Sequence, residues 1–361
     1  MTEGKKLRIP SPIVLANLII GAFTGVIHAI LHVWPLLFSL LLGTLIGFLV
    51  GWVLDRAFFR GITQPRKRIV TFLVFILIEP LLLFNFVAPA MAAYMEVHAT
   101  HHPVYLQADV LAEGAVDVAL ITNDNLIISG WYAPSQNNIV IIALHGGNRN
   151  RLDILPQAKA LVNNGFGVLL VDMRGHGNSG GKTYTSCLAK EDVTSAVRYI
   201  QEQEPEALIG AYGLSAGAHT SLCAAAVIEE IQAVFADGVT FGRIEDILFP
   251  RAQSFKPYNL LVPAYWTLSV SKDMFSGYRE PPIQELVKEI SPRPIYFLAA
   301  GNDILEPDQV HRYITFASPE SSIWVAPGVS HGEAFAAYPE EYTRRMAEFF
   351  REVAHNVNEI E

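Results

Sequence analysis

The chain has 361 residues, of which 51% are apolar and only 17% are charged, and its mean hydropathy is +0.29. This composition excludes an intrinsically disordered chain, which needs low hydrophobicity and high net charge, and it indicates membrane-embedded sequence. A net charge of −9 argues against a protein whose main partner is nucleic acid. The charge is uneven: residues 1–103 carry eight Lys/Arg and four Asp/Glu, whereas residues 104–361 carry 18 and 31. A basic, apolar leader therefore precedes an acidic domain.

The leader contains runs of the length that a transmembrane helix needs. No charged residue occurs between Arg8 and Asp55, and this stretch is too long for one span because about 20 apolar residues cross the hydrocarbon core. The turn-forming Trp34-Pro35 divides it. The predicted spans are Ile13–Leu31, Leu36–Leu54 and Ile69–Ala88. We therefore predict a membrane region over residues 1–95 and a linker over residues 96–109.

The basic residues of the leader predict the orientation. Lys and Arg cluster before the first run and between the second and third runs, and both clusters fall in the cytoplasm if the chain crosses three times. Residues 104–361 then lie outside the cytoplasm. Glu79-Pro80 interrupts the third run, and if that run does not span, the acidic domain is cytoplasmic instead. Glycines four residues apart favour close packing in lipid, either with the neighbouring helix or with a second chain. They are Gly21, Gly25, Gly43, Gly47 and Gly51.

The second domain, predicted over residues 110–355, alternates short β-rich runs with helical segments. A hairpin is expected over 116–132, followed by strands at 139–144, 167–171, 208–212, 231–236, 294–299 and 322–325. Alternation of this kind predicts βαβ units and a mostly parallel sheet. An aromatic-rich insertion at about 240–290 interrupts the rhythm. We interpret it as a cap that could bind the apolar part of a substrate.

A G-x-S-x-G motif, Gly213–Gly217, lies between an expected strand and an expected helix, which is the setting of a nucleophile elbow. Ser215 is therefore the predicted nucleophile. A serine needs a base and an acid that orients the base, and His331 and Asp303 each follow an expected strand further along the chain. Asp237 is the rival acid.

An acyl oxyanion needs backbone N–H donors in fixed positions. Ala216, after the nucleophile, and Gly147, in the loop after the strand at 139–144, are the predicted donors. His145 is expected to brace that loop. Cys223 is expected to be a core residue and Cys187 a loop residue, with no reason to pair them. No cofactor and no metal are predicted.

These motifs together resemble one family. HGGN at 145–148, DMRGHGNS at 172–179 and GLSAG at 213–217, followed by Asp303 and His331, are similar to the α/β-hydrolase superfamily across the whole second domain. The likeness is greatest to bacterial membrane-anchored serine hydrolases and to the serine-aminopeptidase-like group. It implies an α/β-hydrolase fold, and it implies structural roles for Asp172, Arg174 and His176.

The combined expectation is a membrane-anchored serine hydrolase that cleaves carboxylic esters, including lipid or acyl esters, through an acyl-enzyme. A peptidase or amidase, or an acyltransferase, could use the same triad. A non-catalytic binding protein of the same fold is a further alternative.

Overall fold

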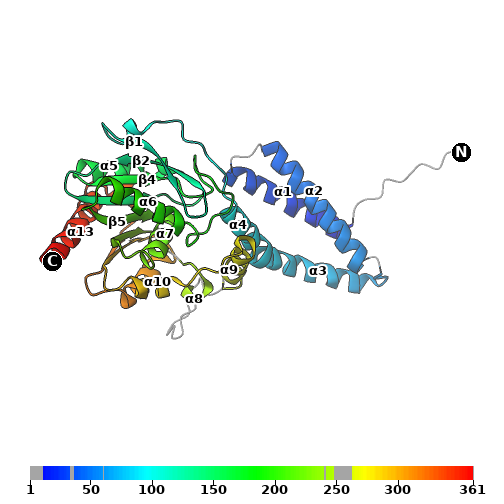
Figure 1. Cartoon of the computed structure of the whole chain (residues 1–361). Coiled ribbons are helices and arrows are strands. Elements are labelled where there is room, and N and C mark those ends of the chain that lie inside the picture. Colours follow the sequence, from blue (N-terminus) through cyan, green and yellow to red (C-terminus); the bar gives the residue numbers. More distant parts are fainter. Residues whose placement is uncertain (1–10, 33–35, 60, 240, 248–261, 361) are drawn as a thin grey trace. The chain divides into compact units, whose positions relative to one another are not determined.

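The computed structural model describes residues 11–32, 36–59, 61–239, 241–247 and 262–360 (Figure 1). The chain forms two compact units, Met1–Phe84 and Asn85–Glu361. The boundary between the two units lies before helix α4, Ala88–Val97. The reason is that α4 packs against α9, Val262–Ser276, and so belongs to the second unit.

The N-terminal unit contains α1 Pro12–His32 and α2 Leu36–Leu54, close to the first two predicted runs, then the π-helical turn η1 Asp55–Phe59 and α3 Pro65–Leu82. Helix α3 begins and ends earlier than the third predicted run, Ile69–Ala88, and the π-helical segment η2 Leu83–Val87 follows it. Glycines bring α1 and α2 into backbone contact. A Cβ at Gly21 would lie 2.1 Å from the Gly43 carbonyl oxygen, and one at Gly47 would lie 2.1 Å from the Asn17 carbonyl oxygen. These glycines therefore serve the packing of two helices within one chain.

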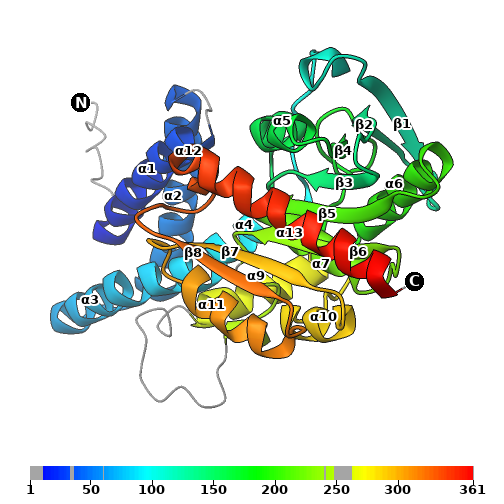
Figure 2. The ribbon, with the colours of Figure 1, turned by 90° about the vertical axis from the view of Figure 1, so that its left-hand side faces the viewer.

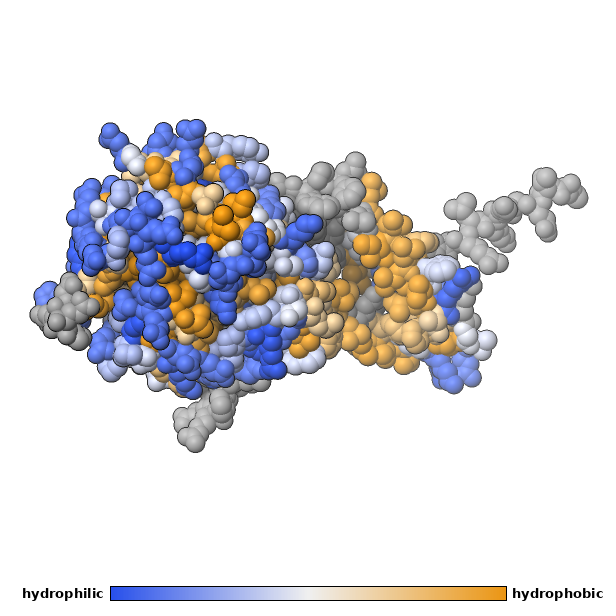
Figure 3. Space-filling model, viewed as in Figure 1, coloured by the Kyte–Doolittle hydropathy of each residue, from blue (hydrophilic) through white to orange (hydrophobic). Residues whose placement is uncertain are grey.

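Within the described ranges, no helix combines the length and the apolar character that crossing a membrane requires. The three spans predicted from the sequence are thus not found there. Large apolar side chains are exposed on α2 and α3, and Figure 3 shows apolar residues gathered on this unit. Examples are Leu41, Leu45, Leu49, Leu73, Leu77 and Leu81.

The second unit is built on an eight-stranded sheet in the order β1-β2-β4-β3-β5-β6-β7-β8. The first hairpin pairs antiparallel, β2 also pairs antiparallel with β4, and all other pairs are parallel. The strands are β1 Val116–Ile121, β2 Ile127–Ala133, β3 Ile139–Leu144, β4 Gly167–Val171, β5 Leu208–Leu214, β6 Ile231–Asp237, β7 Ile295–Ala300 and β8 Ser322–Ala326. Every residue of β3, β4 and β7 is buried, as expected for strands covered on both faces. The predicted mostly parallel sheet is confirmed.

Helices cover both faces of this sheet (Figures 1 and 2). Side chains of α6, α7, α10 and α11 join one apolar core, and those of α5 and α13 join the other. The helices are α5 Leu155–Asn163, α6 Lys190–Gln203, α7 Ala216–Ala225, α8 Ile244–Ile247, α10 Ile283–Ile290, α11 Glu306–Tyr313, α12 Ala334–Ala337 and α13 Pro339–Ile360, with 3₁₀ turns η3 Ala108–Val110, η4 Arg151–Ile154 and η6 Ile314–Phe316. The parallel strands end at a common edge, where the loops that carry the predicted site residues begin.

The predicted cap at 240–290 divides into parts with different surroundings. Helix α10 packs against α7 and belongs to the layer that covers the sheet, whereas α9 packs against α4. Three of the predicted cap aromatics, Phe249, Phe255 and Tyr258, lie outside the described residues. The cavity beside Ser215 is bordered by α4, by Phe241 before α8, by α9 and by the first residue of α10, Ile283.

Candidate active site

Ser215 occupies a sharp turn between β5 and α7. Its backbone has φ 56° and ψ −113°, a left-handed conformation that non-glycine residues rarely adopt. The turn is possible because its neighbours are small: a Cβ at Gly213 would lie 2.2 Å from the Gly217 carbonyl carbon, and one at Gly217 would lie 2.2 Å from the Leu144 carbonyl oxygen. The Ser215 amide donates to the Asp237 carbonyl at 2.7 Å. The elbow geometry predicted from the motif is present.

His331 lies in the loop after β8 and joins the serine to a carboxylate. Its Nε2 is 2.8 Å from Ser215 Oγ, and its Nδ1 is 2.5 Å from Glu306 Oε1. Glu306 is completely buried in the first turn of α11, and its Oε2 accepts a hydrogen bond from the Ala300 amide at 2.7 Å. Ser215, His331 and Glu306 therefore form a continuous chain of hydrogen bonds.

Asp303, the acid predicted from the sequence, does not hold this position. Its Oδ1 accepts from the amides of Leu305 at 2.8 Å and Glu306 at 3.0 Å, so it caps the beginning of α11. The structure thus replaces Asp303 by Glu306 as the partner of His331. The spacing Asp-x-x-Glu before Pro307 is typical of a helix N-terminus. It is the signal in the sequence that could have assigned Asp303 to capping.

The rival acid, Asp237, is buried beneath the same site but bonds elsewhere. Tyr342 Oη donates to Asp237 Oδ2 at 2.7 Å. Burial raises the pKa of Asp237 to about 7, because desolvation disfavours the carboxylate and the nearby Glu306 charge adds to that effect. Two neighbouring acids therefore differ in their roles: Glu306 contacts the imidazole and Asp237 contacts a phenol.

Glu306 also sets the charge state of the imidazole. Its hydrogen bond raises the pKa of His331 above the ordinary value of 6.5, while burial acts in the opposite direction. The charges of Glu306, Asp237 and Asp303 act in the same sense as the hydrogen bond. The site consequently stabilises an imidazolium, which is the species formed when a base takes a proton from serine.

The two predicted oxyanion donors border the same cavity as Ser215. Gly147 and Ala216 both line it, and a Cβ at Gly147 would lie 3.5 Å from the Ala216 Cβ. The loop around Gly147 is fixed on each side. The Gly146 amide donates to Asp153 Oδ2 at 3.3 Å, and the Asn148 amide donates to His176 Nε2 at 3.2 Å.

Two buried histidines support this loop in the neutral form. Burial lowers the pKa of His145 to about 4 and also lowers the pKa of His176. His145 accepts from the Met173 amide at 3.1 Å through Nε2, and its Nδ1 is 2.7 Å from the Gly146 carbonyl oxygen. The expected bracing role of His145 is confirmed.

The polar residues of the DMRGHGNS turn form buried ion pairs and hydrogen bonds with the neighbouring loops and with α6. Asp172 forms a buried ion pair with Arg151 at 2.7 Å and accepts from the Asn178 amide at 2.9 Å. Arg174 pairs with the buried Asp192 at 2.8 Å. These contacts give Asp172 and Arg174 the structural roles that the resemblance implies.

A cavity of about 330 Å³ opens beside Ser215. Its apolar lining includes Val97, Phe241, Leu268 and Ile283, and its polar lining includes Glu96, Tyr184, Thr185, Ser186, His219, Lys272 and Glu280. Lys272 on α9 forms an ion pair with Glu96 on α4. An ion pair therefore stands in a cavity for which the sequence predicted an aromatic, apolar wall.

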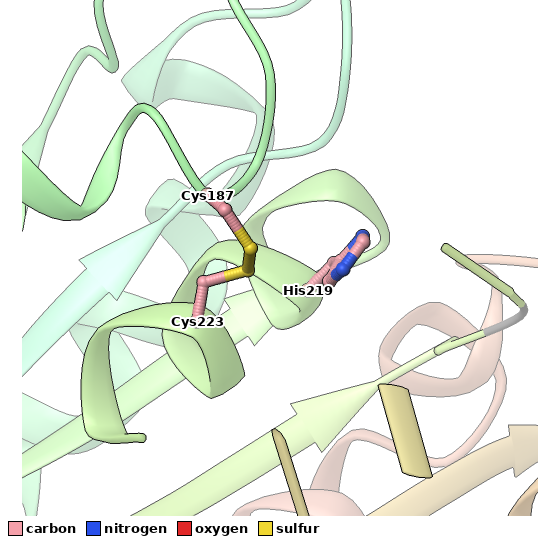
Figure 4. A group of neighbouring side chains, drawn as sticks. All are labelled: Cys187, His219 and Cys223. Carbon is pink, nitrogen blue, oxygen red and sulfur yellow. A yellow bond between two sulfur atoms is a disulfide. The ribbon is translucent and has the colours of Figure 1, made fainter. Parts of the chain in front are cut away.

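Cys187 and Cys223 form a disulfide, so the expectation that they are unpaired is wrong (Figure 4). It links the loop before α6 to α7, and the Cys187 amide donates to Glu280 Oε1 at 2.8 Å. His219 lies beside it, and one ligand atom of each of the three residues falls within 4.8 Å of the others. Because the sulfurs are bonded to each other, they are not the thiolates that a metal needs as ligands.

Comparisons with known proteins agree with this architecture. A family model described as serine aminopeptidase, S33, matches residues 135–243. The chain has the α/β-hydrolase fold. The resemblance to this superfamily that the sequence motifs carry is confirmed, and the likeness to hydrolases supports an enzyme of the serine hydrolase type.

Individual relatives cover most of the second unit. Protein YqkD of Bacillus subtilis (strain 168) is 28% identical over 235 residues, which are 62% of this chain and 74% of that protein. The esterase Pf2001 of Pyrococcus furiosus superposes with a TM-score of 0.59 at 24% identity, covering 71% of this chain and 98% of its own. The α/β hydrolase GrgF from Penicillium sp. sh18 gives a TM-score of 0.54 at 20% identity and covers 66% of this chain and 98% of its own.

Proposed function

We propose that the chain is a serine hydrolase that cleaves carboxylic esters through Ser215, His331 and Glu306. The observation that carries the proposal is the pair of contacts at His331, 2.8 Å to Ser215 Oγ and 2.5 Å to Glu306 Oε1. The imidazole thus has the nucleophile on one nitrogen and a buried carboxylate on the other, as nucleophilic catalysis by serine requires.

The reaction follows from these positions. Ser215 Oγ attacks the ester carbonyl carbon while His331 Nε2 takes the hydroxyl proton, and Glu306 holds the Nδ1 proton of the resulting imidazolium. The amides of Gly147 and Ala216 donate to the developing oxyanion. The intermediate then expels the alcohol, which receives the proton from His331, and leaves an acyl-Ser215 ester.

Water completes the cycle. His331 Nε2 takes a proton from a water molecule as its oxygen attacks the acyl carbonyl. The second tetrahedral intermediate expels Ser215 Oγ, which recovers its proton from His331, and the carboxylic acid leaves. If an alcohol takes the place of water, the same steps transfer the acyl group, which is the acyltransferase alternative.

Ser215→Ala tests the proposal directly. Wild-type protein should hydrolyse p-nitrophenyl esters of short acyl chains and should react with a fluorophosphonate probe at Ser215, whereas the alanine variant should do neither. Hydrolysis that survives in the variant would remove Ser215 from its role. Folded protein that neither hydrolyses nor reacts would favour the non-catalytic alternative.

The family model described as serine aminopeptidase favours a peptidase as the second candidate. Its chemistry is the same, with an amine in place of the alcohol as leaving group. A panel of aminoacyl amides beside the esters separates the two, since only a peptidase should turn over the amides at a rate comparable with the esters.

We further propose that the N-terminal unit attaches the protein to a membrane, with the hydrolase unit outside the cytoplasm. The exposed leucines of α2 and α3 support contact with lipid. The disulfide between Cys187 and Cys223 supports an oxidising compartment. Protease treatment of intact cells should digest the hydrolase unit. Protection that ends only when the membrane is broken would place it in the cytoplasm, and recovery in the unsedimented fraction without detergent would refute attachment.

A further inference from the structure

His219 is a buried imidazole one helical turn beyond the nucleophile. It is 8% exposed, it lines the same cavity as Ser215, and its amide donates to the Ser215 carbonyl at 3.2 Å. Four residues of an α-helix rise about 6 Å, and helical side chains lean toward the N-terminus of their helix. The imidazole therefore borders the cavity about one helical turn from the nucleophile.

This imidazole has an unused hydrogen-bonding atom. Among the described residues, Nε2 of His219 has no hydrogen-bond partner, and a buried polar atom left in this state is costly. Figure 4 shows the ring extending away from the disulfide. A Cβ at Gly242 would lie 2.7 Å from Cε1 and 3.0 Å from Nε2 of His219, so the Gly242 backbone lies against this edge of the ring and leaves no room for a larger residue.

Burial lowers the pKa of His219, although the charges of Glu280 and Asp246 act in the opposite direction and that of Lys272 acts with burial. A neutral imidazole offers one N–H donor and one acceptor nitrogen. Nε2 is therefore a donor in one tautomer and an acceptor in the other, and a hydroxyl or an amide can pair with it in either case.

The charges of the cavity restrict the partner further. Glu96, Lys272 and Glu280 line it, with Lys272 paired to Glu96. The two carboxylates and one ammonium leave an excess of negative charge, which opposes a substrate carboxylate. The hydroxyl-bearing Thr185 and Ser186 lie on the same wall.

We propose that His219 is a specificity residue that binds a neutral hydroxyl or amide of the substrate, a few bonds from the scissile ester. The inference rests on the proposed ester hydrolysis and names its substrate class: short, polar, uncharged esters. A site built to bind a hydroxyl discriminates strongly against the analogue that lacks it, because its own polar atom is then left buried and unpaired.

Two matched ester pairs test it, one for each side of the carbonyl. The first is p-nitrophenyl 3-hydroxybutanoate against 3-methylbutanoate, and the second is 2-hydroxyethyl butanoate against propyl butanoate. The hydroxylated member of at least one pair should have a kcat/KM about 10- to 100-fold higher, mainly through KM. A hemisuccinate ester should be a poor substrate.

Variants assign the preference to the imidazole. His219→Leu should reduce the ratio within the pair to near 1, and His219→Gln, which keeps a donor and an acceptor, should restore most of it. Ser221→Ala is the matched control on the same helix, since Ser221 Oγ donates to the Gly217 carbonyl at 2.9 Å and Ser221 lies outside the cavity lining. Its ratio should equal that of wild type, and thermal unfolding should check that each variant is folded.

The outcomes separate the two proposals. Ser215-dependent hydrolysis with ratios near 1 in both pairs, a preference that survives His219→Leu, or a preference for the hemisuccinate would overturn the role of His219 and leave the ester hydrolase intact. If folded wild-type protein neither hydrolyses esters nor reacts with the fluorophosphonate probe, the proposed function is overturned, and the specificity role of His219 is overturned with it.

Discussion

Replacing Glu306 by glutamine should disable catalysis while preserving the shape of the site. Both carboxylate oxygens of Glu306 accept: Oε1 from His331 Nδ1–H and Oε2 from the Ala300 amide. A glutamine has only one acceptor oxygen, so its NH₂ group must face one of these two N–H groups. The variant therefore loses the negative charge beside the imidazole and also one of these two hydrogen bonds.

The size of the effect follows from the role of the acid. In Ser-His-Asp sites, replacing the acid by its amide lowers kcat by about 10⁴-fold, which corresponds to about 5 kcal/mol at about 1.4 kcal/mol per tenfold. Glu306 is completely buried, so water cannot substitute for its charge. We expect Glu306→Gln to lower kcat by about 10³- to 10⁴-fold. KM should change by only a few-fold, because Glu306 is absent from the cavity lining.

Asp303→Asn is the matched control. Asparagine keeps the side-chain oxygen that accepts from the Leu305 and Glu306 amides, and it is as good a helix cap as aspartate. We expect kcat within about threefold of wild type and a change in stability below about 1 kcal/mol. Initial rates with p-nitrophenyl butanoate and the rate of fluorophosphonate labelling measure both variants. A larger loss of kcat in Asp303→Asn than in Glu306→Gln would refute the assignment of the acid.

Three further results are expected. Glu306 holds the pKa of His331 above 6.5, and the base must be neutral, so kcat/KM should fall as the pH drops through a midpoint above 6.5. In Glu306→Gln this midpoint should move to lower pH. A midpoint that does not move would contradict the contact between Glu306 and His331. Reducing the disulfide, which joins cysteines 36 residues apart, should lower the free energy of unfolding by about 3–4 kcal/mol; the double variant Cys187→Ser/Cys223→Ser should show this loss without reductant, and a further loss on adding reductant would argue against the bond. Gly217→Ala should abolish labelling because its Cβ would lie 2.2 Å from a carbonyl at the end of β3, and full labelling of this variant would show that the elbow can relax.

The sequence predicts the frame of the site well because the frame depends on short-range patterns. Buried parallel strands appear as continuous apolar runs. The glycines of the Gly213–Gly217 motif indicate a turn around Ser215 that is too crowded for larger residues. His331 follows the last strand, at the sheet edge where the site forms. Each of these features is local in the chain, so the residues alone carry it.

Which carboxylate contacts His331 depends instead on the length of the side chain. Asp303 and Glu306 both follow β7, and both carboxylates lie near His331. Only the longer side chain, starting inside the first turn of α11, extends back to Ala300 and to the imidazole. An aspartate after a strand is the usual expectation, and only the capping pattern around Pro307 argues against it.

The disulfide could not be predicted for a different reason. Cys187 lies in a turn before α6, outside any helix or strand, and its distance from Cys223 depends on how that loop lies on α7. The loop is placed by a contact between segments far apart in the sequence, in which the Cys187 amide binds Glu280. No spacing rule for cysteines contains this information.

The character of the cavity depends on the same kind of distant contact. Aromatic residues of the insertion suggested an apolar wall, and Phe241 does line the cavity. The remaining lining comes partly from α4, which precedes the whole sheet and brings Glu96 against Lys272 of α9. A hydrocarbon chain laid over this pair would remove water from both charges without replacing its hydrogen bonds. The aromatic composition of the insertion alone thus favours apolar esters as substrates, whereas the contact between α4 and α9 favours small polar esters.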